Sequence, residues 1–160
     1  MMVIDKQGAQ ITLREMEEKD VEQVTALEAA CFSQPWLKQD FIEILTNPNR
    51  IYLVATEKNA LQEDTILGGC MLTHIVGEGD ISNVAVWEAY RKRGIASALL
   101  QELLQIGMEK YHMNAFTLEV RQHNEAAIRL YEKAGFISEG IRPNFYDKPK
   151  DNAVIMWKRI

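Results

Sequence analysis

The clearest binding chemistry in this sequence belongs to a basic, glycine-containing segment, residues 90–100 (YRKRGIASALL), which leads into a helical pattern. The first turn of a helix carries backbone N–H groups without an intrahelical acceptor, and the helix dipole makes that end partially positive. Gly94 would let an anion approach the backbone, and the run from Arg91 to Arg93 would add positive charge. The segment therefore predicts a phosphate-binding turn, although a basic helix start with a glycine for close packing has the same pattern.

A carboxylate that could act as a general base follows this helix. Residues 116–121 alternate strictly, with apolar side chains on one face and Glu119 on the other, so Glu119 lies on the polar face of a predicted strand. Ligands of open α/β sheets collect near the carboxyl ends of strands, which favours a catalytic role. The alternative is an exposed glutamate paired with Arg121, two residues further on.

Tyr131 is the candidate general acid. It falls on the apolar face of a predicted helix over residues 125–134, and a buried tyrosine usually finds a partner for its hydroxyl group. That partner would be a leaving group in a functional site, or a backbone carbonyl in a purely structural one. Asn124 is predicted to cap this helix and to lie near any cofactor held between the neighbouring strands.

Two loops carry aromatic residues that could form a substrate mouth. Phe32, Pro35 and Trp36 lie between the first two predicted helices, and Tyr146 lies in a loop before the last predicted strand. Anchoring in the core is an equally good explanation of these aromatics. Both loops are therefore candidates for substrate contact.

Other classes of site have little support. The three histidines show no ligand spacing, so no metal site is predicted, and no serine or cysteine triad is evident. Cys31 and Cys70 lack a C-x-x-C spacing and are expected to be buried thiols. The glycine spacings of dinucleotide-binding folds and of P-loops are absent, so a nucleotide-type ligand would need a site of another design.

The elements that must position these residues alternate along the chain as β-α-α-β-β-β-α-β-α-β-β. Strands are predicted over residues 11–16, 51–57, 66–76, 81–87, 116–121, 136–141 and 153–158, and helices over 21–31, 37–45, 94–110 and 125–134. Asp20 is the expected N-cap of the first helix, Gly77 and Gly79 are expected in a turn between two strands, and Leu99 and Leu103 share one face of the third helix. Helices that connect strands imply parallel neighbours, whereas the strand runs at both ends suggest antiparallel pairing. A mixed central sheet with helices on both faces is expected.

Length and composition predict one globular domain over residues 1–160, with 47% hydrophobic residues to build a core. No stretch reaches the ~18 apolar residues of a membrane helix and no signal peptide is evident, so a cytoplasmic location is expected. Residues 1–76 contain 6 Lys and Arg against 12 Asp and Glu, and residues 77–160 contain 12 against 11. This acidic first half argues against DNA or RNA as a ligand and suits a cationic substrate.

Taken together, these residues resemble the GCN5-related N-acetyltransferase (GNAT) superfamily over nearly the whole chain. Arg91-x-x-Gly94-x-Ala96 resembles its acetyl-CoA motif, with Ala96 the less usual choice. Within the superfamily, FSQPW (32–36), NVAV (83–86), LEVR (118–121), NEAAI (124–128), LYEKAGF (130–136) and RPNFY (142–146) look like a subgroup, the bacterial ribosomal-protein-alanine N-acetyltransferases of the RimI type. Pro143 and Phe145 depart from that pattern in the last loop.

The resemblance implies a three-layer α/β/α fold. Its mixed, mostly antiparallel sheet would have about seven strands and four helices, and would be splayed between the fourth and fifth strands, at a bulge near Asn83. Glu119 would be the general base and Tyr131 the general acid. The implied acetyl-CoA site comprises Val84, Ala85, Val86, Arg91, Lys92, Arg93, Gly94, Ile95, Ala96, Ser97, Asn124 and Tyr131. The implied substrate site comprises Phe32, Pro35, Trp36, Glu119 and Tyr146.

The implied activity is direct acetyl transfer from acetyl-CoA, without a metal, to the N-terminal alanine of a small-subunit ribosomal protein. A monomer or weak dimer that binds neither membrane nor nucleic acid is expected. An acetyltransferase for lysine side chains or small amines is the first alternative, and a non-catalytic acyl-CoA sensor is the second. The aromatic loops should distinguish the first two, because a peptide N-terminus needs a narrow entrance.

Overall fold

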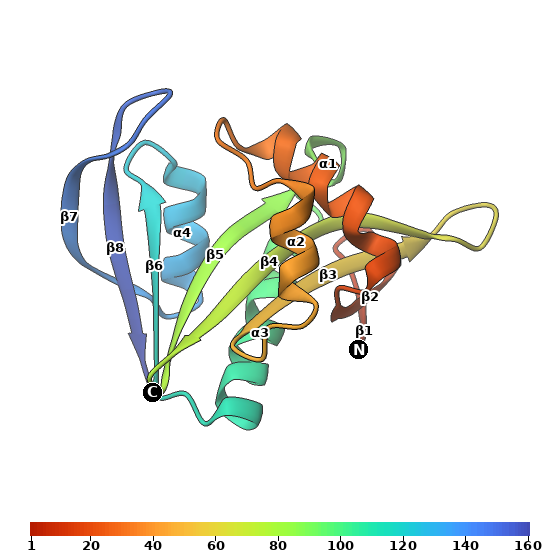
Figure 1. Cartoon of the computed structure of the whole chain (residues 1–160), viewed down its shortest axis with the longest axis horizontal. Coiled ribbons are helices and arrows are strands. Elements are labelled where there is room, and N and C mark those ends of the chain that lie inside the picture. Colours follow the sequence, from red (N-terminus) through yellow and green to blue (C-terminus); the bar gives the residue numbers. More distant parts are fainter.

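An eight-stranded sheet forms the centre of the structure, a computed structural model that describes all 160 residues (Figure 1). The spatial order of the strands is β1-β2-β3-β4-β5-β6-β8-β7. Their bounds are β1 (Met2–Ile4), β2 (Gln10–Glu15), β3 (Arg50–Lys58), β4 (Asp64–Ile75), β5 (Glu78–Val86), β6 (Ala115–Arg121), β7 (Ile137–Tyr146) and β8 (Asp151–Arg159). All neighbours are antiparallel except β5 and β6, which are parallel.

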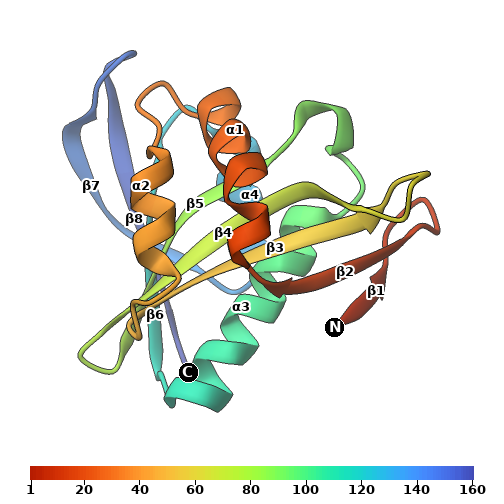
Figure 2. The ribbon, with the colours of Figure 1, turned by 45° about the vertical axis from the view of Figure 1, so that its right-hand side comes forward.

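Helices cover both faces of this sheet, as expected. The helices α1 (Val21–Cys31) and α2 (Lys38–Ile44) lie on one face, and α3 (Ile95–Tyr111) and α4 (Glu125–Lys133) lie on the other (Figure 2). Two short 3-10 helices, η1 (Glu18–Asp20) and η2 (Glu88–Tyr90), precede α1 and α3 respectively. The three-layer α/β/α arrangement is confirmed.

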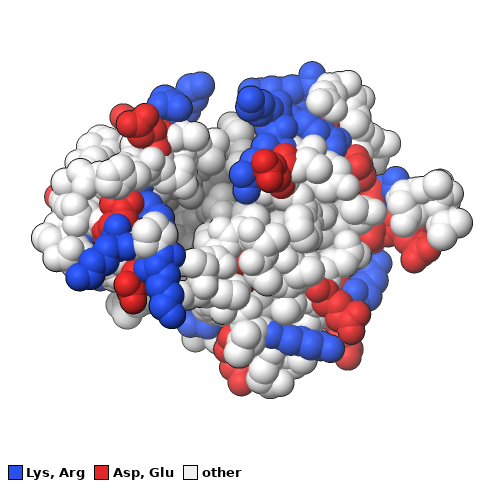
Figure 3. Space-filling model, turned by 90° about the horizontal axis from the view of Figure 1, so that it is seen from above, with Lys and Arg blue, Asp and Glu red and all other residues white.

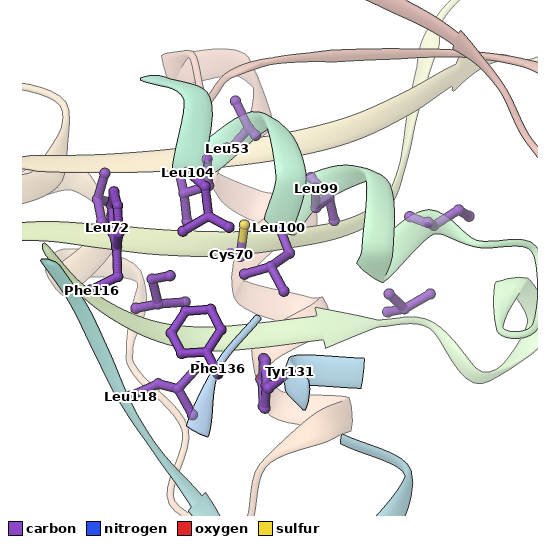
Figure 4. Close-up of a cluster of buried hydrophobic side chains, with 14 of the residues drawn as sticks. Leu53, Cys70, Leu72, Leu99, Leu100, Leu104, Phe116, Leu118, Tyr131 and Phe136 are labelled. Carbon is purple, nitrogen blue, oxygen red and sulfur yellow. The ribbon is translucent and has the colours of Figure 1, made fainter. Parts of the chain in front are cut away.

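Each face of the sheet has its own hydrophobic core. The larger one lies under α3, where Leu99 and Leu103 are fully buried, as their helical spacing predicts, together with Phe116 and Leu118 of β6 (Figure 4). The smaller one joins α1 and α2 to β3 and β4, and Phe41 is fully buried in it. Because strand side chains alternate between faces, burial of Phe116 and Leu118 under α3 directs Glu119 to the opposite face.

The sheet splits between β5 and β6. These strands pair only along Glu78–Ile81 and Ala115–Leu118, and no pairing joins them beyond Ile81. A β-bulge in β5 adds to the divergence, because Met71 pairs with Ser82 and Gly69 with Ala85, so that two residues of β5 oppose one of β4. The expected split and the bulge at Asn83, whose φ is 55°, are both present.

The structure corrects the predicted elements at several points. There are eight strands rather than seven, because β1 was too short to show an alternating pattern. Strand β7 extends to Tyr146, so the loop that follows contains only residues 147–150. Asp20 stands at the start of α1 without capping it, since its carboxylate binds Arg14 and the Glu17 N–H instead. Gly79, expected in a turn, lies within β5.

No helix in the structure has both the length and the apolar character needed to cross a membrane. Cys31 and Cys70 are free thiols, and Cys70 is buried as expected while Cys31 is half-buried. No three His, Cys, Asp or Glu side chains are grouped so that they could hold a metal ion.

Candidate active site

The basic turn lies at the N-terminus of α3, as the sequence predicts. Gly94 is the residue before the first turn of α3 and has a φ of 82°, which favours glycine, and Lys92 also has a positive φ of 67°. The Gly94 carbonyl accepts the first helical hydrogen bond, from the Ala98 N–H, at 3.0 Å. The free N–H groups of the first turn can therefore bind an anion.

The side chain of Arg93 does not project toward this turn, which corrects the expectation of three available cations. It is buried, and its guanidinium binds the carboxylates of Asp5 and Glu57. Burial works against ionisation of Asp5, but hydrogen bonds from the Ala9 N–H and Arg93 outweigh it and lower its pKa. Arg91 donates from Nε to the Val86 carbonyl at 3.1 Å, whereas Lys92 is exposed. The segment from Arg91 to Arg93 therefore holds the turn in place, through the contacts of Arg91 and Arg93, and also gives it positive charge.

A basic pocket of about 350 Å³ lies next to the turn, between α3 and α4. Its lining includes three cations, Lys6, Arg129 and Lys133, and no acidic residue. Ser97 of the first turn of α3 also lines it, so the pocket is continuous with the helix N-terminus. Asn124 caps the nearby α4 by accepting the Ala127 N–H at 3.2 Å, as predicted.

Two carboxylates lie where β5 and β6 diverge. Glu119 is on the face away from α3, and Asp80 of β5 pairs with Thr117, two residues before it. Burial, and then the charge of Glu119, raise the pKa of Asp80. Asp80 was not predicted as a site residue, because its approach to Glu119 depends on the register between β5 and β6, which no local pattern specifies.

Glu119 does not pair with Arg121, the ionic partner expected if it had only a structural role. It pairs with Arg142 of β7 at 3.2 Å, in a half-exposed position. Arg121 instead donates to the backbone carbonyls of Asp147 and Pro149, at 3.1 and 2.7 Å, and so holds the end of the β7–β8 hairpin.

Tyr131 lies on the opposite face of the sheet from Glu119, in the larger core. Its ring is buried 6.0 Å from that of Phe136, and burial raises the pKa of its hydroxyl group (Figure 4). The side chain therefore keeps its proton at neutral pH, as a general acid must.

The α1–α2 loop and the end of β7, which carry the aromatic residues expected to contact the substrate, stand at the same end of the molecule. Trp36 packs against Phe41, with ring centroids 5.7 Å apart, and Arg50 stacks on it, so this loop is anchored in the smaller core. Phe32 is half-buried in the same core and Pro35 is half-buried beside it in the loop. Tyr146 packs under Arg121 at 4.5 Å, and burial, followed by the charge of Glu119, raises its pKa to about 12.

A hollow opens at this end between the two halves of the molecule, with basic side chains along its rim (Figure 3). The α1–α2 loop and the tip of the β7–β8 hairpin both reach this end (Figure 1). The structure thus brings the split strands, the α3 N-terminus, the α1–α2 loop and the end of β7 to one end of the sheet.

This geometry agrees with comparisons with known proteins. A family model described as "Acetyltransferase (GNAT) family" matches residues 21–136. The chain belongs to the GNAT acetyltransferase family. As a member of this family, the protein is an N-acetyltransferase.

Individual GNAT relatives extend over nearly the whole chain. A putative [ribosomal protein bS18]-alanine N-acetyltransferase of Bacillus subtilis is 33% identical over 150 residues, which cover 92% of this chain and 95% of that protein. The crystal structure of the ribosomal-protein-S18-alanine N-acetyltransferase from Escherichia coli matches with a TM-score of 0.82 and 27% identity, covering 94% of each chain. Arabidopsis thaliana NAA60 in complex with acetyl-CoA shares the fold, with a TM-score of 0.85 at 20% identity, over 94% of this chain and 99% of that one.

Proposed function

We propose that this N-acetyltransferase transfers the acetyl group of acetyl-CoA to the N-terminal alanine of a small-subunit ribosomal protein. The observation that carries the proposal is the split between β5 and β6, with Glu119 on one face of the sheet and Tyr131 on the other. The names of the B. subtilis and E. coli relatives support the choice of substrate. Such a reaction would take place in the cytoplasm, where ribosomes are.

Acetyl-CoA fits this split in three parts. Beyond Ile81, the side of β5 that faces β6 has no strand partner, so the backbone at Val84–Val86 can pair with the amides of the pantetheine arm. The turn from Lys92 to Ser97 would hold the pyrophosphate. The basic pocket lined by Lys6, Arg129 and Lys133 suits the phosphorylated nucleotide end, because three cations face it without a competing carboxylate.

The chemistry requires a neutral amine. An α-amine has a reference pKa of about 7.7–8.0 and a lysine amine about 10.4, so the neutral α-amine is easier to present at neutral pH by ~3–4 kcal/mol. The amine nitrogen attacks the thioester carbonyl while Glu119 takes a proton from it, directly or through water. Backbone N–H groups near Val84–Val86 would stabilise the oxyanion, and the C–S bond then breaks as Tyr131 protonates the sulfur.

The surroundings of Glu119 suit a chain end that carries positive charge. Asp80 and Glu119 place two carboxylates together at the base of the split, where an incoming ammonium group would be attracted. Trp36 of the α1–α2 loop is held in place by Phe41 and Arg50, and Tyr146 at the end of β7 is held in place by Arg121. A mouth fixed in this way would admit a peptide end more readily than the middle of a chain.

Two peptides test the substrate. One has a free N-terminal alanine and a ribosomal-protein-like sequence, and the other has a blocked N-terminus and free lysines. We expect acetylation of the first alone, with the acetyl group located by mass spectrometry. Label on lysine side chains, or turnover only with small polyamines, would instead support the alternative acetyltransferases.

A substitution tests the role of Glu119. Glu119→Gln should lower kcat by about 10²–10⁴-fold and leave acetyl-CoA affinity nearly unchanged, because it keeps the shape but removes the base. Glu139→Gln is the matched control, since Glu139 also forms an exposed ion pair between strands, with Arg159, away from the split. A wild-type kcat in Glu119→Gln from pH 6 to 9 would remove Glu119 from the mechanism.

A further inference from the structure

Glu28 of α1 is a buried carboxylate that the chemistry above does not use. Only 1% of its surface is exposed. One oxygen, Oε1, accepts hydrogen bonds from Asn83 Nδ2 at 2.6 Å and from the Trp36 backbone N–H at 3.4 Å, whereas the buried Oε2 has no partner. Burying a carboxylate without a cation is unfavourable, so stability alone does not explain this residue.

The two partners of Glu28 belong to different parts of the candidate site. Asn83 is the bulge residue of β5, with a φ of 55°, and it immediately precedes the free edge at Val84–Val86. Trp36 lies in the α1–α2 loop, at the proposed mouth for the peptide. One carboxylate oxygen therefore joins the strand that would bind pantetheine to the loop that would bind the peptide.

Cys31 of α1 also contacts β5, through a weak hydrogen bond to the Val86 carbonyl at 3.7 Å, but only Glu28 contacts the bulge residue through its side chain. The Asn83 amide makes no other side-chain hydrogen bond, and Glu28 is separated from Asn83 by 55 residues. The bulge backbone departs from regular strand pairing between Gly69 and Met71, so ladder hydrogen bonds leave it less constrained than the rest of β5. The hydrogen bond from Asn83 to Glu28 of the covering helix can therefore favour one bulge conformation.

We propose that Glu28 is a positioning residue for acetyl transfer, which holds the β5 bulge at Asn83 and the α1–α2 loop at Trp36 in one arrangement. This inference rests on the proposed use of Val84–Val86 in cofactor binding. Without Glu28, the bulge conformation that can bind CoA would be only one of several populated conformations. The apparent Kd for CoA would then equal the intrinsic Kd divided by the fraction of molecules in that conformation. Burial raises the pKa of Glu28, in agreement with its apolar surroundings.

Substitutions at Glu28 separate positioning from stability. Glu28→Leu replaces the buried carboxylate with an apolar side chain of similar size, so the melting temperature should stay the same or rise. Its Kd for CoA, measured by isothermal titration calorimetry, should nevertheless rise about tenfold, as expected if the competent bulge is populated at about one tenth. Glu28→Gln retains an acceptor for Asn83 Nδ2 and the Trp36 N–H, so it should bind CoA within about twofold of the wild type.

The partner residue provides an independent check that does not depend on replacing a core side chain. Asn83→Gly accepts the positive φ but loses the amide donor, so it should weaken CoA binding as Glu28→Leu does. The double variant should be no worse than either single one, because both remove the same link. Wild-type CoA affinity in Glu28→Leu or in Asn83→Gly would overturn the inference, and so would additive losses.

These readouts also separate this inference from the proposed function. CoA affinity is measured without any peptide, so it reports on the Glu28 link even if the ribosomal-protein substrate is wrong. If the wild-type protein acetylates another amine, the substrate proposal fails while the CoA measurements still stand. If the wild-type protein does not bind CoA, both fail together.

Discussion

Gly94 offers the sharpest test of the phosphate-binding turn. At its φ of 82°, a residue with a Cβ is strained by ~1–2 kcal/mol. An added Cβ would meet only the Lys6 side chain, at 3.4 Å, so Gly94→Ala introduces strain without a severe clash. If the free protein keeps this strain, the melting temperature falls by up to about 2–8 °C for a chain of this size. If the turn relaxes, the strain must be restored when CoA binds, and the Kd rises by up to about 5–30-fold.

We expect the second outcome for Gly94→Ala, because the turn is partly exposed and can change shape. Gly77→Ala is the matched control, since Gly77 has a φ of 80° in the β4–β5 turn and an added Cβ there meets nothing within 4 Å. Thermal unfolding and calorimetric titration with CoA, applied to both variants, give the comparison. Equal losses of melting temperature in both variants, with wild-type CoA affinity in Gly94→Ala, would refute the role of the turn in binding phosphate.

Two further predictions concern the ion pair of Asp5 with Arg93 and the proposed contact of Tyr146 with the substrate. The pKa of Asp5 is lowered in the folded state, so this residue contributes stability above its unfolded pKa of about 3.9, and that contribution is lost as the pH falls through the folded pKa. The free energy of unfolding of Asp5→Asn, measured by urea titration, should therefore be lower than that of the wild type at pH 7. It should also change less than the wild-type value between pH 5 and 3. Parallel pH profiles of the two proteins would contradict this expectation. Tyr146→Ala should raise the KM for the peptide several-fold more than the KM for acetyl-CoA, in initial-rate measurements, whereas Tyr146→Phe, which keeps the ring under Arg121, should change both less. An equal rise in both KM values for Tyr146→Ala would place its effect on the fold rather than on the mouth.

Most of the fold could be read from local patterns. The alternation around Leu118 and the spacing of Leu99 and Leu103 correctly predicted which side chains are buried under α3. The sequence also predicted the glycine before α3 and the cap at Asn124, because these signals depend on backbone conformation within a few residues. The strand β1 escaped detection, since three residues are too few to show a period and it is defined by its pairing with β2.

The ionic partners of charged side chains could not be predicted from local patterns. Arg93 was expected near an anion but lies between Asp5 and Glu57, which are 88 and 36 residues away, and Glu119 pairs with Arg142 rather than with Arg121. These pairs depend on which strands become neighbours and on how far β5 and β6 diverge, and a linear pattern contains neither quantity.

The sequence by itself thus determined the elements, the buried faces and the motif at the start of α3, because each follows from backbone preference and hydrophobic period over short distances. Only the tertiary structure decided that Asp80 stands beside Glu119, and that Glu28 reaches both Asn83 and Trp36. The physical reason is that a side chain's ionic and hydrogen-bond partners are set by packing between elements, which brings together residues that no local preference connects.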